Sequence, residues 1–194
     1  MKGKGLVLAS ASPRRREILT LSGVPFEVCA AADEQAPEGL APADLVRALA
    51  RSKASQVAAQ YADRVILGAD TMVVLDGKML GKPTSGQHAV EMLMSLQGRE
   101  HQVMTGVWLI RTNDGKIIVK EDGFTDVATV KFFPMTREEA EEYVATGEPM
   151  DKAGAYGIQG YAMRFVEGIN GDFYTVMGLP AGRLLRFLHD FQAD

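Results

Sequence analysis

The sequence passes from a short apolar segment into a basic one, Leu6-Val7-Leu8-Ala9-Ser10-Ala11-Ser12-Pro13-Arg14-Arg15-Arg16. The apolar residues predict a buried strand over 5–10. Ser12 followed by Pro13 is typical of a helix N-cap and first helical position, so we expect a helix over 13–22 that ends at Gly23. A strand that leads directly into a helix presents backbone N–H groups and the positive end of the helix dipole, which together favour an anion.

Three consecutive arginines follow this junction. Arginine binds phosphate through paired donors and keeps its charge at neutral pH. The alternative interpretation is a solvated basic surface, because three consecutive residues cannot share one helix face. Basic residues in a first helical turn oppose the dipole, and a bound anion would offset that cost. We therefore favour a phosphate-bearing ligand at this junction.

The composition is that of a soluble globular protein. The 194 residues are 46% hydrophobic and 24% charged, and the chain is long enough for one good-sized core. The net charge of −4 and the pI near 5.5 argue against stable nucleic-acid binding. A local basic cluster in an acidic protein indicates a small anionic ligand instead.

The cysteine content and the length of the apolar segments indicate the cellular compartment. Cys29 is the single cysteine, which excludes an internal disulfide and fits a reducing compartment. Its strand-like surroundings predict a packed core thiol. No apolar segment approaches membrane-spanning length, and the first one is too short for a signal peptide. We expect a cytoplasmic protein without membrane association.

Strand and helix patterns alternate along the chain, which predicts an α/β fold. We expect a mixed, curved sheet with flanking helices, in a single domain over 1–194 that has two lobes around a central cleft. Further strands are expected at 26–31 and 64–70, further helices at 42–61, 86–97, 137–146 and 180–191, and hairpin turns at Asp76-Gly77, Asn113-Asp114-Gly115 and Asn170-Gly171. Thr136 and Glu139 form a predicted capping box.

Several polar residues outside the first helix are candidates for chemistry. Asp70 closes the predicted strand 64–70, where α/β folds place ligands, although such a residue also caps turns. Lys82 in Gly81-Lys82-Pro83 could hold an ammonium against a phosphate, and the same tripeptide occurs in ordinary turns. Asp33 and Glu34 form an acidic pair on a loop, for which plain solvation is the favoured interpretation.

A glycine-rich stretch over 151–160 contains Gln159, whose amide both donates and accepts hydrogen bonds. That property suits the edge of a nucleobase, and a structural glutamine is equally compatible. Carboxylates together with Arg and Lys suit Mg²⁺ bound to a polyphosphate. No His/Cys spacing suits zinc, and neither a Gly-x-Ser-x-Gly elbow nor a P-loop is present in the sequence.

Taken together, these residues resemble the Maf family of nucleoside triphosphate pyrophosphatases, also called septum formation inhibitor-like proteins. The motifs that carry the resemblance are Leu8 to Arg15, Asp33-Glu34, the helix with Lys53, Gly68 to Thr71, Gly81-Lys82-Pro83, Asp151 to Gly160 and Val176 to Pro180. The resemblance implies a fold like that of Maf and inosine triphosphate pyrophosphatases. It also implies hydrolysis between the α and β phosphates of a nucleoside triphosphate, which gives the monophosphate and pyrophosphate.

The resemblance implies roles for individual residues. Those expected to hold the phosphates are Ser10, Arg15, Lys53 and Lys82. Glu34 and Asp70 are expected to hold Mg²⁺ or Mn²⁺, and Asp70 is also implied as the proton acceptor. An ordinary aspartate is a weak base at neutral pH, so a role for Asp70 in orienting a metal-bound water fits the physics equally well.

Three positions indicate the substrate. Arg14, Thr71 and Gln159 resemble the family branch that acts on dTTP and UTP, rather than the 7-methyl-GTP branch. A nucleotide-sensing regulator of cell division without turnover, a 7-methyl-GTP pyrophosphatase and a nucleic-acid-binding protein remain as alternatives. The expected partner is a nucleoside triphosphate, and the sequence leaves a homodimer open.

Overall fold

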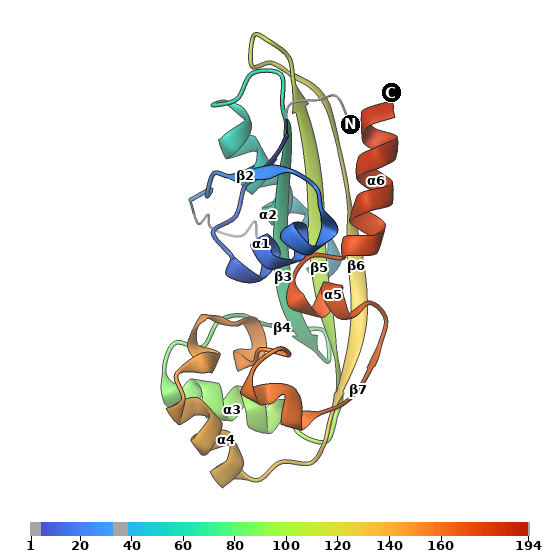
Figure 1. Ribbon diagram of the computed structural model, residues 1–194. Helices are drawn as coiled ribbons and strands as arrows, with labels where there is room; N and C mark the ends of the chain where they lie inside the picture. Colours follow the sequence, from blue (N-terminus) through green and yellow to red (C-terminus); the bar gives the residue numbers. More distant parts are fainter. Residues whose placement is uncertain (1–4, 33–38, 194) are drawn as a thin grey trace. The chain divides into compact units, whose positions relative to one another are not determined.

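The structure is a computed structural model that describes residues 5–32 and 39–193. Its elements in chain order are β1 (Leu6–Leu8), α1 (Pro13–Ser22), β2 (Phe26–Val28), α2 (Pro42–Ala58), β3 (Val65–Leu75), β4 (Lys78–Leu80), α3 (Gly86–Leu96), β5 (Glu100–Thr112), β6 (Ile118–Phe132), α4 (Arg137–Ala145), the 3-10 helices η1 (Glu148–Asp151), η2 (Ala153–Ala155) and η3 (Tyr161–Phe165), β7 (Val166–Asn170), α5 (Phe173–Met177) and α6 (Ala181–Ala193) (Figure 1). None of the helices within the described ranges is long and apolar enough to cross a membrane.

The strands form one seven-stranded sheet in the order β2-β1-β3-β5-β6-β7, with β4 paired to β3. β1 is parallel to β2 and β3, whereas β3–β4 and β6–β7 are antiparallel, so the predicted mixed sheet is confirmed. The chain divides into two compact units. The first unit comprises Met1–Asp70, Thr105–Asp126 and Gly178–Asp194, and the second comprises Thr71–Met104 and Val127–Met177. The single domain over 1–194 and the central cleft stay predictions.

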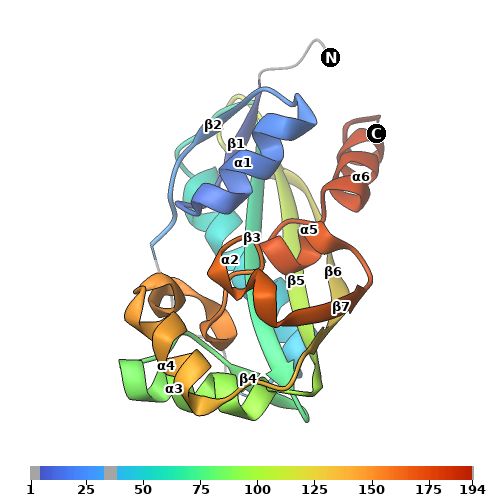
Figure 2. The ribbon, with the colours of Figure 1, turned by 60° about the horizontal axis from the view of Figure 1, so that its bottom comes forward.

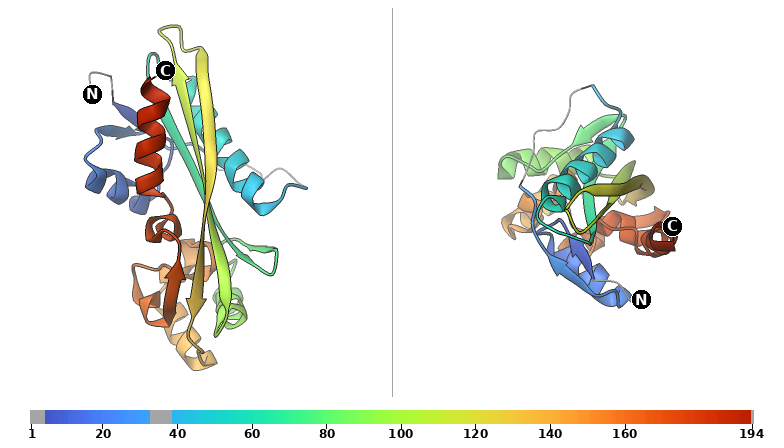
Figure 3. Two further views of the ribbon diagram at one scale, coloured as in Figure 1. Left: turned by 90° about the vertical axis from the view of Figure 1, so that its right-hand side faces the viewer. Right: turned by 90° about the horizontal axis from the view of Figure 1, so that it is seen from above.

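The first unit is built around β1. Leu8 is in register with Val28 of β2 and with Leu67 of β3, both in parallel. The chain leaves β1 through α1 to reach β2, and then passes through α2 to reach β3 on the other side of β1. Right-handed crossovers in opposite directions place their helices on opposite faces of a sheet. In this unit α1 and α6 accordingly cover one face and α2 the other (Figure 2, Figure 3).

Two glycines let the backbone of α2 lie directly against the sheet. A Cβ atom at Gly68 of β3 would lie 2.0 Å from the carbonyl oxygen of Ala50, and one at Gly106 of β5 would lie 2.3 Å from that of Val46. The small residues Ala50 and Ala54 of α2, both fully buried, line this contact. Any side chain at Gly68 would therefore push helix and strand apart.

The second unit contains α3 and α4, which pack against each other and against the 3-10 helices of residues 148–155. The predicted capping box of α4 is confirmed, since the Thr136 N–H donates to Glu139 Oε2 at 2.8 Å and the Glu139 N–H to Thr136 Oγ1 at 3.3 Å. The hairpin at Asp76-Gly77 is also confirmed. Both turn residues have positive φ, 50° and 75°, which is the geometry of a type I′ turn.

A buried aromatic cluster anchors the glycine-rich stretch in this unit. The Tyr156 hydroxyl lies 2.8 Å from His101 Nε2, and both rings pack edge-to-face against Phe132. Burial lowers the pKa of His101 to about 4, so the imidazole is neutral at physiological pH. Tyr156 therefore fixes the middle of the stretch to the core of the second unit.

Three sequence expectations are wrong in detail. β3 does not end at Asp70 but continues to Leu75, because Met72-Val73-Val74-Leu75 is an apolar, strand-forming run. Asp70, Thr71 and Met72 are half-buried, but the strand passes through them without a break. The hairpin at Asn170-Gly171 is absent, since α5 follows β7; the Asp172 carboxylate accepts from the Tyr174 N–H at 2.9 Å and begins a helix there. Cys29 is half-buried at the margin of the core rather than inside it.

Replacing Gly68 with Ala should lower the free energy of unfolding by about 1–3 kcal/mol or more, because a backbone oxygen occupies the position of the new methyl group. The matched control is Gly182→Ala in α6, where nothing lies within 4 Å of the added atom. That variant should be neutral or more stable by about 0.5–1 kcal/mol. Urea denaturation of both proteins measures the difference, and equal midpoints would contradict the close-packing argument.

Candidate active site

The turn between β1 and α1 is fixed by the Ser10 hydroxyl. Ser10 is 7% exposed and follows the last residues of β1 that pair with β3. Its Oγ accepts from the Ser12 N–H at 3.2 Å and from Arg15 Nη1 at 3.0 Å. Ser12 occupies the predicted N-cap position of α1, but its side chain makes no capping hydrogen bond. The hydroxyl of Ser10 thus organises the junction that the sequence indicated as an anion site.

Arg15 is a buried cation in the same turn. It is 9% exposed, and its Nε donates to the Gly178 carbonyl at 2.9 Å in addition to the bond with Ser10. Burial lowers the pKa of the Arg15 guanidinium, the charge of Asp70 opposes that shift, and Arg14 adds to it. The Ser10 hydroxyl and the Gly178 carbonyl therefore help to hold the Arg15 guanidinium in this turn, near the charge of Asp70.

Sequence reasoning assigned no role to Gly178, although it lies in the motif Val176 to Pro180. Its φ of 116° lies in the region that residues with side chains rarely adopt, which is a reason for glycine here. The only sequence signal was the glycine itself, and a backbone carbonyl 163 positions from Arg15 has no side-chain signature.

Lys53 of α2 and Asp70 of β3 form an ion pair, with side chains that are 17% and 16% exposed. The pair depends on the close approach at Gly68. Lys53 lies three residues after Ala50 on α2, and Asp70 lies two residues after Gly68, on the same face of β3. The sequence predicted a separate role for each residue but not their contact.

Asp70 also lies beyond the end of the neighbouring parallel strand. The pairing of β1 with β3 ends at Leu8 and Leu67, three residues before Asp70. Ser10 and Asp70 therefore both follow the carboxyl end of the β1–β3 pair, at the strand where the chain order reverses. Ligands in open α/β sheets bind at such positions. Asp70 thus lies near the carboxyl end of β1 although β3 itself continues, and its place in a ligand site stays a prediction.

The first turn of α1 carries basic side chains. Within the described residues of its first turn there is no Asp or Glu, and Arg14 and Arg15 follow Pro13. Arg14 is half-buried. The described charges of this group are thus those of Arg14, Arg15, Lys53 and Asp70, with the positive ones in excess. An excess of positive charge at a helix N-terminus suits an anion.

The remaining candidates belong to the second unit. Thr71 is half-buried and directly follows Asp70, whereas Lys82 and Gln159 are exposed. The Gly154 N–H donates to the Gly81 carbonyl at 3.0 Å, so the structure brings the Gly81-Lys82-Pro83 segment to the glycine-rich stretch. Within this unit, two segments that the sequence singled out separately are neighbours.

A model of the Maf-like protein family matches residues 5–191. The chain belongs to this family. It is 48% identical over 187 residues to a protein of Symbiobacterium thermophilum named dTTP/UTP pyrophosphatase, a match that covers 96% of this chain and 93% of the relative. A protein of Bacillus velezensis with the same name is 46% identical over 189 residues, which covers 97% of each chain. The solved structure of the Staphylococcus aureus Ham1 protein matches 66% of this chain and 72% of its own chain, with 14% identity and a TM-score of 0.44.

The side chains of this Maf-like chain can be compared with the ligands that a divalent cation prefers. Within residues 5–32 and 39–193, no group of three or more His, Cys, Asp or Glu side chains could hold a metal ion. Glu34 lies outside the described residues. Mg²⁺ commonly takes only one or two protein carboxylates and completes its shell with phosphate oxygens and water. The carboxylate of Asp70 beside an anion site fits that pattern, so a cation that arrives with a phosphate ligand is compatible with these residues.

The charges of the first unit predict opposite effects for the two partners of the Lys53–Asp70 pair. In EDTA, Lys53→Met should weaken the binding of inorganic tripolyphosphate about tenfold, because a charge-assisted hydrogen bond is lost. Asp70→Asn should strengthen it, because the negative charge beside the site is removed. Isothermal titration calorimetry measures both.

The control for this pair of variants is Lys131→Met, since Lys131 is exposed, pairs with Glu167 and belongs to the second unit. It should bind tripolyphosphate as the wild type does. Unchanged affinity in both Lys53→Met and Asp70→Asn would place the anion site away from this ion pair.

Proposed function

We propose that this chain is a nucleoside triphosphate pyrophosphatase that hydrolyses dTTP and UTP to the monophosphate and pyrophosphate. The observation that carries the proposal is the arrangement of Ser10, buried Arg15 and the Lys53–Asp70 pair at the carboxyl end of β1. Two relatives that match nearly the full chain are named dTTP/UTP pyrophosphatase, which supports the substrate.

The triphosphate is held by cations and by the helix N-terminus in this proposal. Ser10, Arg15, Lys53 and Lys82 contact phosphate oxygens, and the uncapped start of α1 adds its dipole. The oxygen of a water molecule attacks the α-phosphorus, the bond from that phosphorus to the bridging oxygen breaks, and pyrophosphate leaves in line. Positioning and neutralisation of charge dominate such a reaction.

The proposed role of Asp70 depends on whether its ion pair with Lys53 is intact. Without substrate its carboxylate is neutralised by Lys53. A triphosphate competes for the Lys53 ammonium, and Asp70 then becomes available to accept a proton or to bind a cation. A divalent cation, Mg²⁺ or Mn²⁺, would supply charge neutralisation and a polarised water when bound to Asp70 and Glu34.

The setting of the enzyme is also a proposal. We expect it to act in the cytoplasm on free nucleotides, without membrane or stable nucleic-acid binding, in line with one cysteine and a net charge of −4. The homodimer that the sequence left open stays a prediction.

The test is product analysis on a panel of nucleotides with Mg²⁺ in ¹⁸O-labelled water. The proposal expects pyrophosphate release from dTTP and UTP, with the label in the monophosphate because water attacks the α-phosphorus. Binding without turnover would indicate the regulator, and a preference for 7-methyl-GTP would indicate the other family branch. Label in the inorganic product would exclude the proposed attack.

Asp70→Asn should keep the fold and lose about 10²–10⁴-fold in kcat for dTTP, because a proton acceptor or a cation ligand is removed. Because the change leaves the Lys53 ammonium without its carboxylate, the urea transition midpoint should fall, and kcat is compared at a temperature where circular dichroism shows the variant folded. A normal kcat in the folded variant would remove Asp70 from the chemistry.

Base preference should follow Arg14, Thr71 and Gln159. The Arg14 guanidinium repels the cationic ring of 7-methylguanine, which an aromatic surface would stabilise by stacking. The combined change Arg14→Trp, Thr71→Gln and Gln159→Glu should therefore shift kcat/KM from dTTP and UTP toward 7-methyl-GTP. The measurement is kcat/KM for the three nucleotides in both proteins, and an unmoved ratio would show that other residues set specificity.

A further inference from the structure

The segment that carries Gln159 is attached at both of its ends to one buried side chain, Tyr143 of α4. The Gly157 N–H donates to the Tyr143 hydroxyl at 3.2 Å. Four residues later, the ring of Tyr161 stacks on the ring of Tyr143, with centroids 5.8 Å apart and an angle of 5° between the planes. Tyr143 is 0% exposed, so it is a fixed support for the segment.

Glu148 joins the same two points. Its Oε1 accepts from the Tyr143 hydroxyl at 2.8 Å, and its Oε2 accepts from the Tyr161 N–H at 2.9 Å. Burial, with help from Glu148, raises the pKa of Tyr143 well above its usual value, so the hydroxyl stays protonated and donates. A hydrogen bond to a carboxylate is stronger than one between neutral groups, so this link is a firm one.

The surroundings leave little freedom for the segment to shift. A Cβ atom at Gly160 would lie 2.2 Å from Glu148 Oε1, so the backbone lies directly against the carboxylate. Ile158 is 8% exposed and packs inward. The guanidinium of Arg164 lies 3.6 Å from the ring centroid of Tyr161 and extends the Tyr143–Tyr161 stack. Gln159 lies midway, two residues from each attached end, and is exposed.

We propose that Tyr143 and Glu148 are positioning residues that set the base selectivity of Gln159. This inference rests on the proposed function, in which Gln159 contacts the base. A glutamine amide both donates and accepts, so it can pair with the edge of thymine or, after rotation, with that of cytosine. Its preference therefore depends on where its backbone is held. A segment fixed before binding also avoids the entropy cost of ordering it on the ligand.

The first experiment is a double-mutant cycle on the ratio of kcat/KM for dTTP to that for dCTP. Tyr143→Phe keeps the stacked ring and removes only the hydroxyl. It should lower the ratio about three- to tenfold, since the two hydrogen bonds of the hydroxyl are lost. Gln159→Ala should lower it by a similar factor. If Tyr143 acts through Gln159, the double variant shows little further loss.

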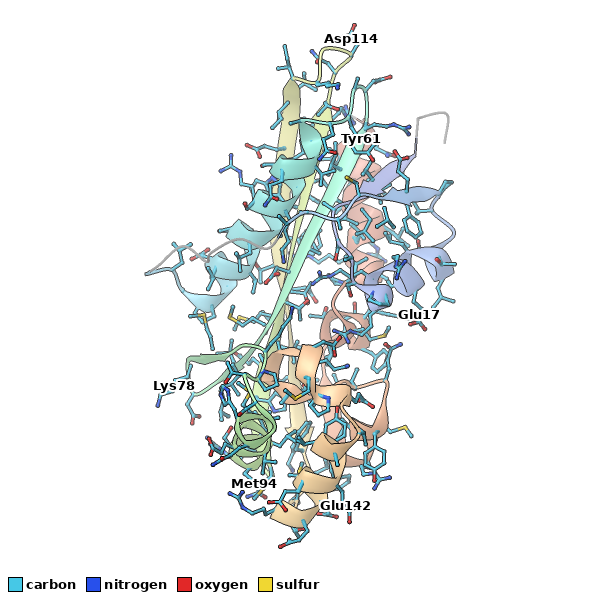
Figure 4. The ribbon with its side chains drawn as sticks, turned by 90° about the vertical axis from the view of Figure 1, so that its left-hand side faces the viewer. Glu17, Tyr61, Lys78, Met94, Asp114 and Glu142 are labelled. Carbon is cyan, nitrogen blue, oxygen red and sulfur yellow. The ribbon has the colours of Figure 1, made fainter. Side chains whose placement is uncertain are left out.

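Two controls separate positioning from general destabilisation. Thr136→Ala removes the cap of the same helix, α4, without touching Gly157 or Tyr161, and should lower thermal stability while leaving the ratio unchanged. Glu142→Gln alters an exposed carboxylate of α4 (Figure 4) and should change neither quantity. A ratio that falls in Thr136→Ala as much as in Tyr143→Phe would overturn the positioning role.

Glu148 provides an independent pair of variants. Glu148→Ala removes both acceptors and should lower the dTTP-to-dCTP ratio at least as much as Tyr143→Phe. Glu148→Gln keeps one acceptor and should restore part of the lost dTTP-to-dCTP ratio. Equal ratios in the wild type and Glu148→Ala, with dTTP hydrolysis intact, would contradict the inference while leaving the proposed function standing.

Amide hydrogen exchange tests the attachment without any substrate. Tyr143→Phe should speed exchange at the Gly157 amide, and Glu148→Ala should speed it at the Tyr161 amide, because each loses its acceptor. If exchange responds and the dTTP-to-dCTP ratio of Gln159→Ala does not, the specificity assigned to Gln159 fails. If exchange at both amides is unchanged, the attachment itself is wrong.

Discussion

The close approach of helix α2 to strand β3 at Gly68 determines where the charges of the first unit lie. Helix and strand backbones meet there because no Cβ separates them, and a methyl group would lie 2.0 Å from a carbonyl oxygen. Lys53 lies about one turn beyond this contact on α2, and Asp70 lies two residues beyond Gly68 on β3. The close approach therefore brings the Lys53 ammonium to the Asp70 carboxylate. The packing of two regular elements fixes the relative position of two residues that are 17 apart in sequence.

The cations of the first unit are held by different kinds of partner. Lys53 and Asp70 neutralise each other, whereas the described hydrogen bonds of Arg15 go to the hydroxyl of Ser10 and the carbonyl of Gly178. Burial of that guanidinium is unfavourable, as the direction of its pKa shift indicates. A bound anion would offset this cost. The Ser10 hydroxyl and the Gly178 carbonyl hold the Arg15 guanidinium at the turn between β1 and α1, where the proposed phosphate would meet it.

Features with a local physical cause could be predicted from the sequence. The β1–α1 junction, the type I′ turn at Asp76-Gly77 and the capping box of Thr136 and Glu139 each depend on residues within a few positions of one another, and all three are confirmed. The contacts that organise the site depend on distant segments. The Lys53–Asp70 pair requires the seating of α2 on Gly68, and the Gly178 carbonyl has no side chain to mark it. The hairpin predicted at Asn170-Gly171 does not form, because Asp172 caps a helix instead. Asn and Asp favour both turns and helix N-caps, so the local sequence was compatible with either structure.

Phosphate contacts and base contacts use different physical means in the proposed function, and this difference separates turnover from selectivity. The triphosphate is common to all nucleotides, so contacts from Arg15 and Lys53 would stabilise every substrate equally and cannot choose among bases. Discrimination needs polar groups whose position is fixed, since a misplaced amide can accept either base edge. In the second unit Tyr143 and Glu148 provide such fixation through a buried hydroxyl, a carboxylate and a stacked ring. Because neither residue is among those proposed to hold the phosphates, we expect that altering this support changes selectivity and leaves the proposed phosphate-binding charges as they are.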